Sequence, residues 1–313
     1  MKNKKNDINN DQNKKSNNRN NLKTNYLGLD IMKLLIIFLL IFLVINNAKK
    51  MTNKKIIEQN INVEEKKDKE IEEKATKIPI FTFHRIVSDK LKNERFKDNE
   101  WAASIDVFES QIKYMYDNGY RTINMDEFYC WYRKECEFPK KTVMITFDDG
   151  NADDYYLVMP VLKKYNFKAT TFIVGSRTLD IDENPYDENT RTFITKELIT
   201  KTKKVYPNLE YQSHTWDMHQ VDSNKKERVL NLTEEEIKED FDKQEQFHFK
   251  YLAYPYGVYN KEIIKQLKEH KYNLAFTFRT HDYATRESKQ YEIPRIKING
   301  YSDVDEIKKW LNY

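Results

Sequence analysis

Val143-Met-Ile-Thr-Phe-Asp-Asp-Gly150 is a short apolar run that ends in two adjacent carboxylates and a glycine. An uninterrupted run of this length, rich in β-prone residues, is typical of a buried strand in a parallel sheet. Successive side chains of a strand point in opposite directions, so Asp148 and Asp149 should diverge at its C-terminal end. One carboxylate could bind a metal while its neighbour faces what the metal holds. The alternative is that an Asp caps the helix expected from Ala152.

Similar apolar runs recur along the chain and alternate with amphipathic stretches that have the period of a helix. The other strand-like runs are residues 78–83, 169–174, 209–213, 250–254 and 273–278. The expected helices are residues 107–118, 152–165, 234–246 and 261–270. Strands that alternate with helices imply a parallel sheet with crossover helices. Six or seven such units predict an α/β fold of the closed, irregular (β/α) barrel type, whose active site lies at the C-terminal ends of the strands.

The composition supports a globular domain and excludes several classes of protein. Of the 313 residues, 39% are hydrophobic and 13% aromatic, which excludes wholesale disorder. Two cysteines, Cys130 and Cys136, are too few for a disulfide scaffold or a Cys-rich zinc module; they could pair outside the cell or remain thiols. Residues 1–50 hold ten of the 54 Lys and Arg but only three of the 50 Asp and Glu, so the remainder is mildly acidic. We therefore expect no nucleic-acid partner, because such binding needs a basic folded face.

The N-terminal part differs in character from the rest of the chain. Residues 1–30 are a basic, Asn- and Lys-rich tail that we expect to be disordered and cytoplasmic. Residues 31–48 include twelve unbroken apolar residues, 34–45, a length between that of a signal peptide and that of a membrane span. We expect an uncleaved signal anchor that holds the protein in the cell membrane, with a cleaved signal peptide and secretion as the alternative. Residues 49–77 are predicted to be a charged linker, and 78–313 an extracytoplasmic barrel domain.

Two of the six histidines follow another strand-like run. His214 and His219 lie five positions apart, directly after residues 209–213. A single His is more often structural, but neutral imidazoles at a strand end can converge on one metal ion. With Asp149 they make a two-histidine, one-carboxylate set that leaves positions open for water and substrate, as in catalytic zinc sites. We therefore expect a divalent metal cofactor, with Zn²⁺ as the expected ion.

A third polar strand end is Ala253-Tyr-Pro-Tyr-Gly257, whose Gly and Pro permit a tight turn with backbone N–H groups facing an oxyanion. Together with Thr146-Phe-Asp-Asp-Gly150 and the segment from His214 to His219, it resembles the three motifs of the polysaccharide deacetylases. This family is also called the NodB-homology or carbohydrate esterase group. The resemblance implies a distorted (β/α)₇ barrel, preceded here by the transmembrane or signal segment. It also implies metal-dependent removal of N-acetyl groups from N-acetylglucosamine polymers.

Departures from the common family pattern point to one branch. The second-motif histidines are five positions apart where most members have four, and the usual late Leu-x-His motif is missing. Instead, Phe83-His84-Arg85 ends the first strand-like run. This arrangement, with Ile293-Pro-Arg-Ile296, resembles the branch that deacetylates poly-β-1,6-N-acetylglucosamine. Leu252 stands where the family has an Arg that orients the catalytic Asp, and Arg295 or Arg85 is the expected replacement.

The resemblance implies a role for each site residue. The expected metal ligands are Asp149, His214 and His219. Asp148 would be the general base and His84 the general acid that protonates the departing amine. The backbone N–H of Tyr256 would stabilise the oxyanion. Tyr256 and Trp216 could also stack on sugar rings.

The predicted substrate and partner is an extracellular polysaccharide that contains N-acetylglucosamine, poly-β-1,6-N-acetylglucosamine first, with acetate as a product. Peptidoglycan is the near alternative, because the chemistry is the same on a different polymer. O-deacetylation of a polysaccharide and a catalytically inactive, carbohydrate-binding barrel are further alternatives. The second of these is disfavoured because every metal ligand and both acid/base residues are present. The membrane is the other expected partner, through residues 31–48.

Overall fold

The computed structural model describes residues 39–44, 46–51, 73–181, 186–222 and 226–313. The chain divides into two units, Met1–Ile71 and Glu72–Tyr313. The predicted tail, much of the predicted membrane segment and most of the linker lie outside the described residues. Residues 39–44 and 46–51 are helical. Among the residues that are described, no helix is both long and apolar enough to span a bilayer.

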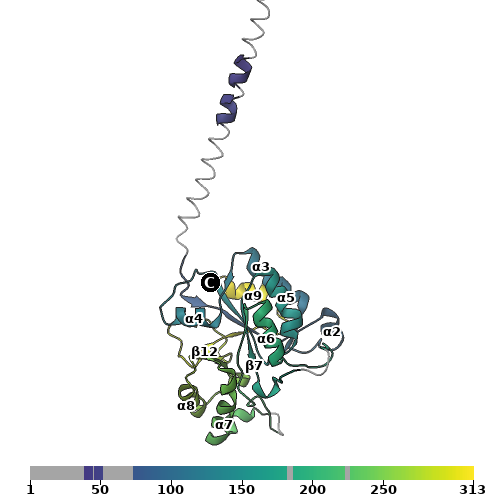
Figure 1. Cartoon of the computed structure of the whole chain (residues 1–313), viewed down its shortest axis with the longest axis vertical. Helices are drawn as coiled ribbons and strands as arrows, with labels where there is room; N and C mark the ends of the chain where they lie inside the picture. Colours follow the sequence, from purple (N-terminus) through teal and green to yellow (C-terminus); the bar gives the residue numbers. More distant parts are fainter. Residues whose placement is uncertain (1–38, 45, 52–72, 182–185, 223–225) are drawn as a thin grey trace, which may run out of the picture. The chain divides into compact units, whose positions relative to one another are not determined.

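The second unit is built on a central parallel sheet (Figure 1). Its strands are β2 (Ile80–Phe83), β6 (Thr142–Phe147), β7 (Ala169–Ile173), β8 (Leu209–Ser213), β9 (Tyr251–Ala253), β10 (Leu274–Thr277), β12 (Ile293–Pro294) and β13 (Ile296–Lys297). They are ordered β12-β10-β9-β8-β7-β6-β2-β13, and every neighbouring pair is parallel. A short strand, β5 (Arg121–Thr122), adds to β6. The six predicted strand runs all contain strands of this sheet.

The sheet curls into a nearly closed barrel, and the segment 293–297 joins its two edges. β12 pairs with β10 at one edge, whereas β13 pairs with β2 at the other. Only Arg295 separates these two strands in the sequence. One short segment therefore takes the place of a seventh strand, and the parallel barrel fits the predicted (β/α)₇ architecture.

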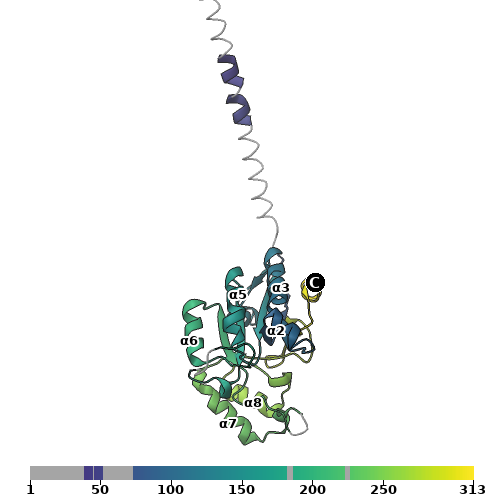
Figure 2. The same ribbon diagram turned by 90° about the vertical axis from the view of Figure 1, so that its right-hand side faces the viewer.

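Helices surround this sheet in both views (Figures 1 and 2). They are α2 (Asp89–Glu94), α3 (Ile105–Asp117), α4 (Met125–Tyr132), α5 (Met159–Tyr165), α6 (Lys196–Val205), α7 (Glu234–Gln244), α8 (Lys261–Glu269) and α9 (Val304–Leu311). A π-helical turn, Asp154–Val158, leads into α5. Polar residues start most of them: Thr233 and Glu236 form a reciprocal capping box at α7, which satisfies backbone N–H groups that no helical carbonyl can reach.

Short strand pairs and one disulfide complete the unit. β1 (Lys77–Ile78) pairs with β11 (Ala284–Thr285), and β3 (Arg85–Val87) with β4 (Ala102–Ser104). Cys130 of α4 is bonded to Cys136, with their Cα atoms 5.4 Å apart. Of the two states left open by the sequence, the structure thus has the disulfide.

The inward-facing residues of β2 and β6 change in character along the barrel. Ile80 and Met144 pack in an apolar cluster that includes Trp131 of α4. Two positions further along each strand, Thr82 Oγ1 and Thr146 Oγ1 lie 3.1 Å apart in a hydrogen bond. The next residues in the same alternation lie at the strand ends and belong to the site. Because side chains alternate along a strand, the inward-facing residues of β2 and β6 are apolar at the bottom of the barrel and polar toward its mouth.

Candidate active site

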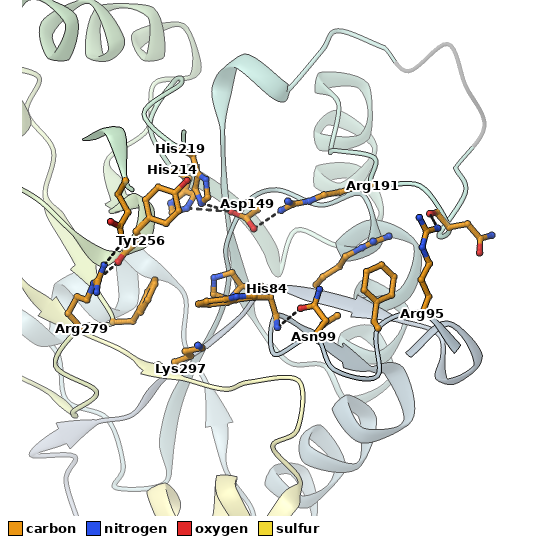
Figure 3. Close-up of a pocket in the computed structure, with 17 residues that line it drawn as sticks. His84, Arg95, Asn99, Asp149, Arg191, His214, His219, Tyr256, Arg279 and Lys297 are labelled. Carbon is orange, nitrogen blue, oxygen red and sulfur yellow. Dashed lines mark hydrogen bonds and ion pairs between the residues drawn. The ribbon is translucent and has the colours of Figure 1, made fainter. Parts of the chain in front are cut away.

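A cavity of about 700 Å³ opens at the C-terminal ends of the strands. It is lined by residues from several strand ends, which Figure 3 shows facing a common space. Those predicted from the sequence are His84, Asp149, His214, His219 and Tyr256. The three polar strand ends recognised in the sequence thus meet at one place, as a barrel requires.

Asp149, His214 and His219 offer ligand atoms that all lie within 4.8 Å of one another. Asp149 Oδ1 is 3.0 Å from His219 Nε2 and 3.7 Å from His214 Nε2. This buried oxygen accepts no well-formed hydrogen bond from the described residues. His214 Nδ1 lies 2.8 Å from the Ala253 carbonyl and donates to it, which leaves the Nε2 lone pair facing Asp149. An anionic oxygen and nitrogen lone pairs that converge in this way fit a shared cation, and the donor types suit zinc.

The charge states of two of these ligands also fit a metal. Burial lowers the pKa of His214 to about 4, so its imidazole is neutral at physiological pH and its lone pair is free to bind. Burial raises the pKa of Asp149, but the adjacent His219, whose Nε2 lies 3.0 Å from Oδ1, outweighs this and holds the pKa well below its usual value. A neutral imidazole and an ionised carboxylate are the forms that coordinate metals.

Asp148, the predicted general base, forms a buried ion pair with Arg295. Arg295 Nη1 donates to Asp148 Oδ1 and Nη2 to Oδ2, each at 2.8 Å, and both side chains are 0% exposed. Burial raises the pKa of Asp148, but the Arg295 guanidinium and then His214 outweigh it, so the pKa lies below its usual value. Arg295 thus provides the guanidinium beside Asp148 that Leu252, at the position of the motif Arg, cannot provide. Arg85, the other predicted replacement, contacts Asp153 instead, at 2.7 Å.

His84 lies at the end of β2 and faces the same cavity (Figure 3). Its ring packs against Trp101, with centroids 4.5 Å apart, and against Phe278. Its buried Nδ1 has no hydrogen-bond partner among the described residues. Burial lowers the pKa of His84, although the charges of Asp149 and Asp148 act to raise it. Its imidazole is therefore neutral at rest and, once protonated, gives up the proton readily.

Three non-glycine residues in the loops after the strands adopt left-handed backbone conformations. The φ angles are +78° at Asp149, +68° at Thr215 and +59° at Tyr256. Such conformations are uncommon for β-branched and aromatic residues, and they concentrate at functional sites because the surrounding structure must hold them. The turn at Tyr256 brings its ring against His219, with centroids 4.4 Å apart. Arg279 fixes this turn because its Nε donates to the Tyr256 carbonyl at 2.8 Å.

Trp216 does not line this cavity. Its ring lies over Gly175, where an added Cβ would come within 2.5 Å of the indole, and it borders a smaller cavity. The backbone N–H groups of Trp216 and of the next residue donate to Asp240 at 2.7 Å, so this segment supports the loop between the two histidines. Trp101 is instead the tryptophan at the mouth, 40% exposed beside His84. No sequence pattern marks Trp101.

A further residue at the site escaped the sequence motifs. Arg191 Nη2 donates to Asp149 Oδ2 at 2.7 Å, on the side of the carboxylate away from the histidines. It follows a stretch without strand or helix periodicity, and no local signal connects it with Asp149.

The chain is similar to known proteins in sequence and in fold. Residues 136–275 match the family described as polysaccharide deacetylase. The poly-beta-1,6-N-acetyl-D-glucosamine N-deacetylase of Staphylococcus aureus (strain MRSA252) is 32% identical over 247 residues, which cover 76% of this chain and 79% of that protein. The protein of that name from Staphylococcus epidermidis is 27% identical over 300 residues, covering 89% of this chain and 96% of that protein.

Among solved structures, IcaB from Ammonifex degensii has a TM-score of 0.61 and 21% identity, covering 76% of this chain and 98% of that one. This likeness shows a shared fold. The de-N-acetylase of Aggregatibacter actinomycetemcomitans has the same fold, with a TM-score of 0.62 and 20% identity over 75% of this chain and 99% of that one. The resemblance that the motifs carried is thus confirmed by the sequence relatives: this chain belongs to the polysaccharide deacetylase family.

Proposed function

We propose that this protein is a metal-dependent hydrolase that removes acetyl groups from N-acetylglucosamine residues of an extracellular polysaccharide and releases acetate. One observation carries the proposal. Asp149, His214 and His219 line one cavity together with His84, and Asp148, the residue before Asp149, is a buried carboxylate held by Arg295. A barrel that only binds carbohydrate would have no need of a buried ion pair beside three convergent ligands.

Asp149, His214 and His219 would hold the metal, with zinc as the expected ion. A divalent ion there supplies Lewis acidity toward the acetamide carbonyl and makes water a better nucleophile at neutral pH. The chain's own part is to keep these ligands deprotonated and aimed at one point. The Ala253 carbonyl does this for His214 by fixing its tautomer.

Asp148 and His84 would divide the proton transfers between them. Asp148 is ionised at neutral pH because Arg295 holds its pKa low, and it accepts the proton of the attacking water. His84 donates a proton to the departing amine, since an unprotonated amide nitrogen is a very poor leaving group. Because burial lowers the pKa of His84, the imidazole must first take up a proton from solvent, and it then gives this proton readily to the amine. The backbone N–H of Tyr256, a residue with a left-handed conformation, would stabilise the negative charge that develops on the acetamide oxygen.

The names of the relatives support poly-β-1,6-N-acetylglucosamine as the polymer. Both staphylococcal relatives are named as deacetylases of that polysaccharide. We carry this substrate to the present chain as part of the proposal. The exposed ring of Trp101 and the ring of Tyr256 give the mouth aromatic surfaces of the kind that pack on sugar rings.

The test is acetate release by the purified protein from poly-β-1,6-N-acetylglucosamine and from peptidoglycan in parallel. We expect release from the first polymer, and none from the matched variant Asp148→Asn, which keeps the shape of the side chain but cannot act as a base. Faster release from peptidoglycan would reassign the polymer. No release from either would overturn the enzymatic proposal.

We also propose that residues 31–48 anchor the protein in the cell membrane, with the barrel outside the cytoplasm. The support is the apolar run and the basic residues before it. The untreated protein should be found in the membrane fraction, and protease added to intact cells should degrade the barrel. A barrel protected until the cells are lysed would contradict this location.

A further inference from the structure

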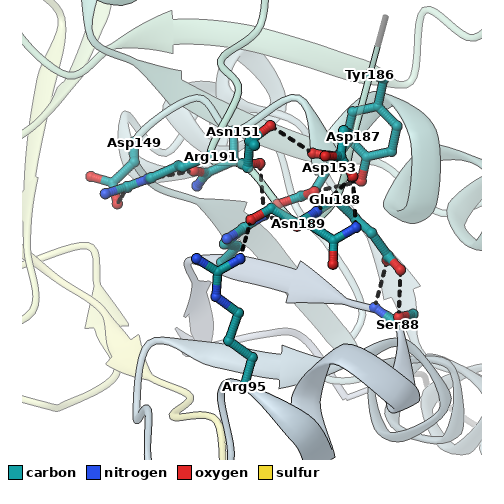
Figure 4. Close-up of polar contacts among 12 residues, drawn as sticks. Ser88, Arg95, Asp149, Asn151, Asp153, Tyr186, Asp187, Glu188, Asn189 and Arg191 are labelled. Carbon is teal, nitrogen blue, oxygen red and sulfur yellow. Dashed lines mark hydrogen bonds and ion pairs between the residues drawn. The ribbon is translucent and has the colours of Figure 1, made fainter.

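Arg191 is fixed at two points, and one of them is a metal ligand. Its Nη2 donates to Asp149 Oδ2 at 2.7 Å and its Nε to Asn151 Oδ1 at 3.0 Å (Figures 3 and 4). The planar guanidinium therefore holds Oδ2 of Asp149 in place. The other oxygen, Oδ1, is left facing the imidazoles of His214 and His219.

Arg191 is held in place by the segment that precedes it, residues 186–191, which we call the rim strap. The Arg191 side chain is 46% exposed, and its guanidinium lies over the Phe193 ring, 5.2 Å from the ring centroid. Arg85 supplies one anchor, and the Ala152 N–H supplies another by donating to the Thr192 carbonyl at 3.0 Å. Arg85 Nη2 donates to the carbonyls of Glu188, at 2.7 Å, and Thr190, at 3.3 Å, while its Nε is paired with buried Asp153.

Other groups of the β3–α2 region hold the rim strap as well (Figure 4). Ser88 Oγ donates to Glu188 Oε1 at 2.8 Å, and Arg95 Nη1 donates to the Asn189 carbonyl at 2.5 Å. On the other side, Tyr186 Oη donates to Asp153 Oδ1 at 2.5 Å. These bonds connect the metal-ligand loop after β6 to the segment that begins directly after His84.

We propose that the rim strap is a positioning element of the metal site. Arg191 fixes Asp149 so that Oδ1 alone is offered to the metal, and Arg85 holds Arg191 there through the strap. The inference rests on the metal of the proposed function. Hydrogen bonds to ligating carboxylates orient the ligand, and their loss typically weakens metal binding about 10- to 100-fold. Arg suits this task better than Lys, because its fork binds two acceptors at once.

The direct test measures zinc affinity of the full-length protein by competition with a chelating indicator. Arg191→Ala should weaken zinc binding about 10- to 100-fold and change the visible absorption of the Co²⁺-substituted protein, because the freed carboxylate changes its mode of ligation. The zinc affinity of Arg191→Lys should lie between that of the unchanged protein and that of Arg191→Ala. The matched control is Arg133→Ala, which removes an arginine paired with Glu135 on the surface and should leave both readouts unchanged.

Two results would overturn the inference. Unchanged zinc affinity with an unchanged Co²⁺ spectrum in Arg191→Ala would show that Arg191 does not position Asp149. Tighter zinc binding would show that Arg191 competes with the metal for the carboxylate. Both readouts are independent of acetate release, so their failure leaves the proposed deacetylation standing.

A double-mutant cycle tests whether the strap acts through Arg191. Arg95→Ala removes one strap bond without touching the buried Arg85–Asp153 pair. It should weaken zinc binding several-fold in the otherwise unchanged protein and have no further effect when Arg191 is already Ala. Equal losses in both backgrounds would show that the strap does not act through Arg191.

Discussion

Replacing Arg295 should displace the acidic limb of the pH–rate profile. Asp148 and Arg295 are both 0% exposed and share two hydrogen bonds of 2.8 Å. A neighbouring arginine typically lowers the pKa of an Asp by about 1–3 units, at about 1.4 kcal/mol for each unit. Arg295→Met removes this charge but keeps the burial, which acts in the opposite direction. The pKa of Asp148 should therefore rise by about 1–3 units.

The assay is kcat/KM for acetate release as a function of pH, with the unchanged protein and Arg295→Lys beside Arg295→Met. The base works only when ionised, so at a fixed pH on the acidic limb Arg295→Met should be about 10- to 1,000-fold slower. Part of this loss should recover as the pH rises. Arg295→Lys should shift the limb less, because it keeps the charge but loses the fork.

Folding and metal content must be measured in the same samples. Removing one partner of a buried ion pair costs about 3–5 kcal/mol of stability. Because the pKa of Asp148 is lowered by folding, the stability that the pair contributes is present at neutral pH and lost as the pH falls. The difference in melting temperature between the two proteins should therefore shrink in acid. A folded, zinc-loaded Arg295→Met protein with an unmoved acidic limb would refute the assignment of Asp148 as a base tuned by Arg295.

Other predictions follow from the same geometry. His84→Ala should lower kcat on amides by about 10²- to 10⁴-fold without loss of zinc, and it should affect ester substrates far less. As a control, replacing the exposed His281 by Ala should leave kcat nearly unchanged. Equal losses of kcat on amides and esters would show that His84 has a structural role. Removal of the metal by a chelator should abolish acetate release and added zinc should restore it, while His219→Ala should not be restored at the same zinc concentration; full activity without metal would contradict the ligand assignment. A chain that starts at Glu73 should be soluble and keep its turnover number on short oligomers, because the described barrel begins there; an inactive product would show that earlier residues contribute.

The strand pattern allowed much of the fold to be predicted. Each run of buried β-prone residues became a strand of the barrel, and polar residues directly after Phe83, Phe147 and Ser213 came together at one mouth. The alternation of side chains also put His84 on the inward face, two positions after Thr82, and His84 lines the cavity. These features depend on local periodicity, which a sequence displays directly.

The residues that the sequence did not place depend on how the barrel closes. Arg295 reaches Asp148 because the 293–297 segment crosses from one edge of the sheet to the other, and no local pattern describes that crossing. Trp216 was expected at the mouth because it lies between the two histidines, but the loop turns its ring onto Gly175. Trp101 takes a place beside His84 through the pairing of β3 with β4.

Arg295 supplies the guanidinium that the family motif has at the position of Leu252, which shows that the site requires a positive charge beside Asp148. The family pattern places the guanidinium on the strand that here carries Leu252, whereas this chain supplies it from the closing segment. A guanidinium beside Asp148 can come from either side, since only its contact with the carboxylate matters for the pKa. Its source does change the coupling: Arg295 lies between β12 and β13, so the ion pair also joins the closing segment to the end of β6. In this chain, Arg295 therefore lowers the pKa of Asp148 and also joins the segment that closes the barrel to β6.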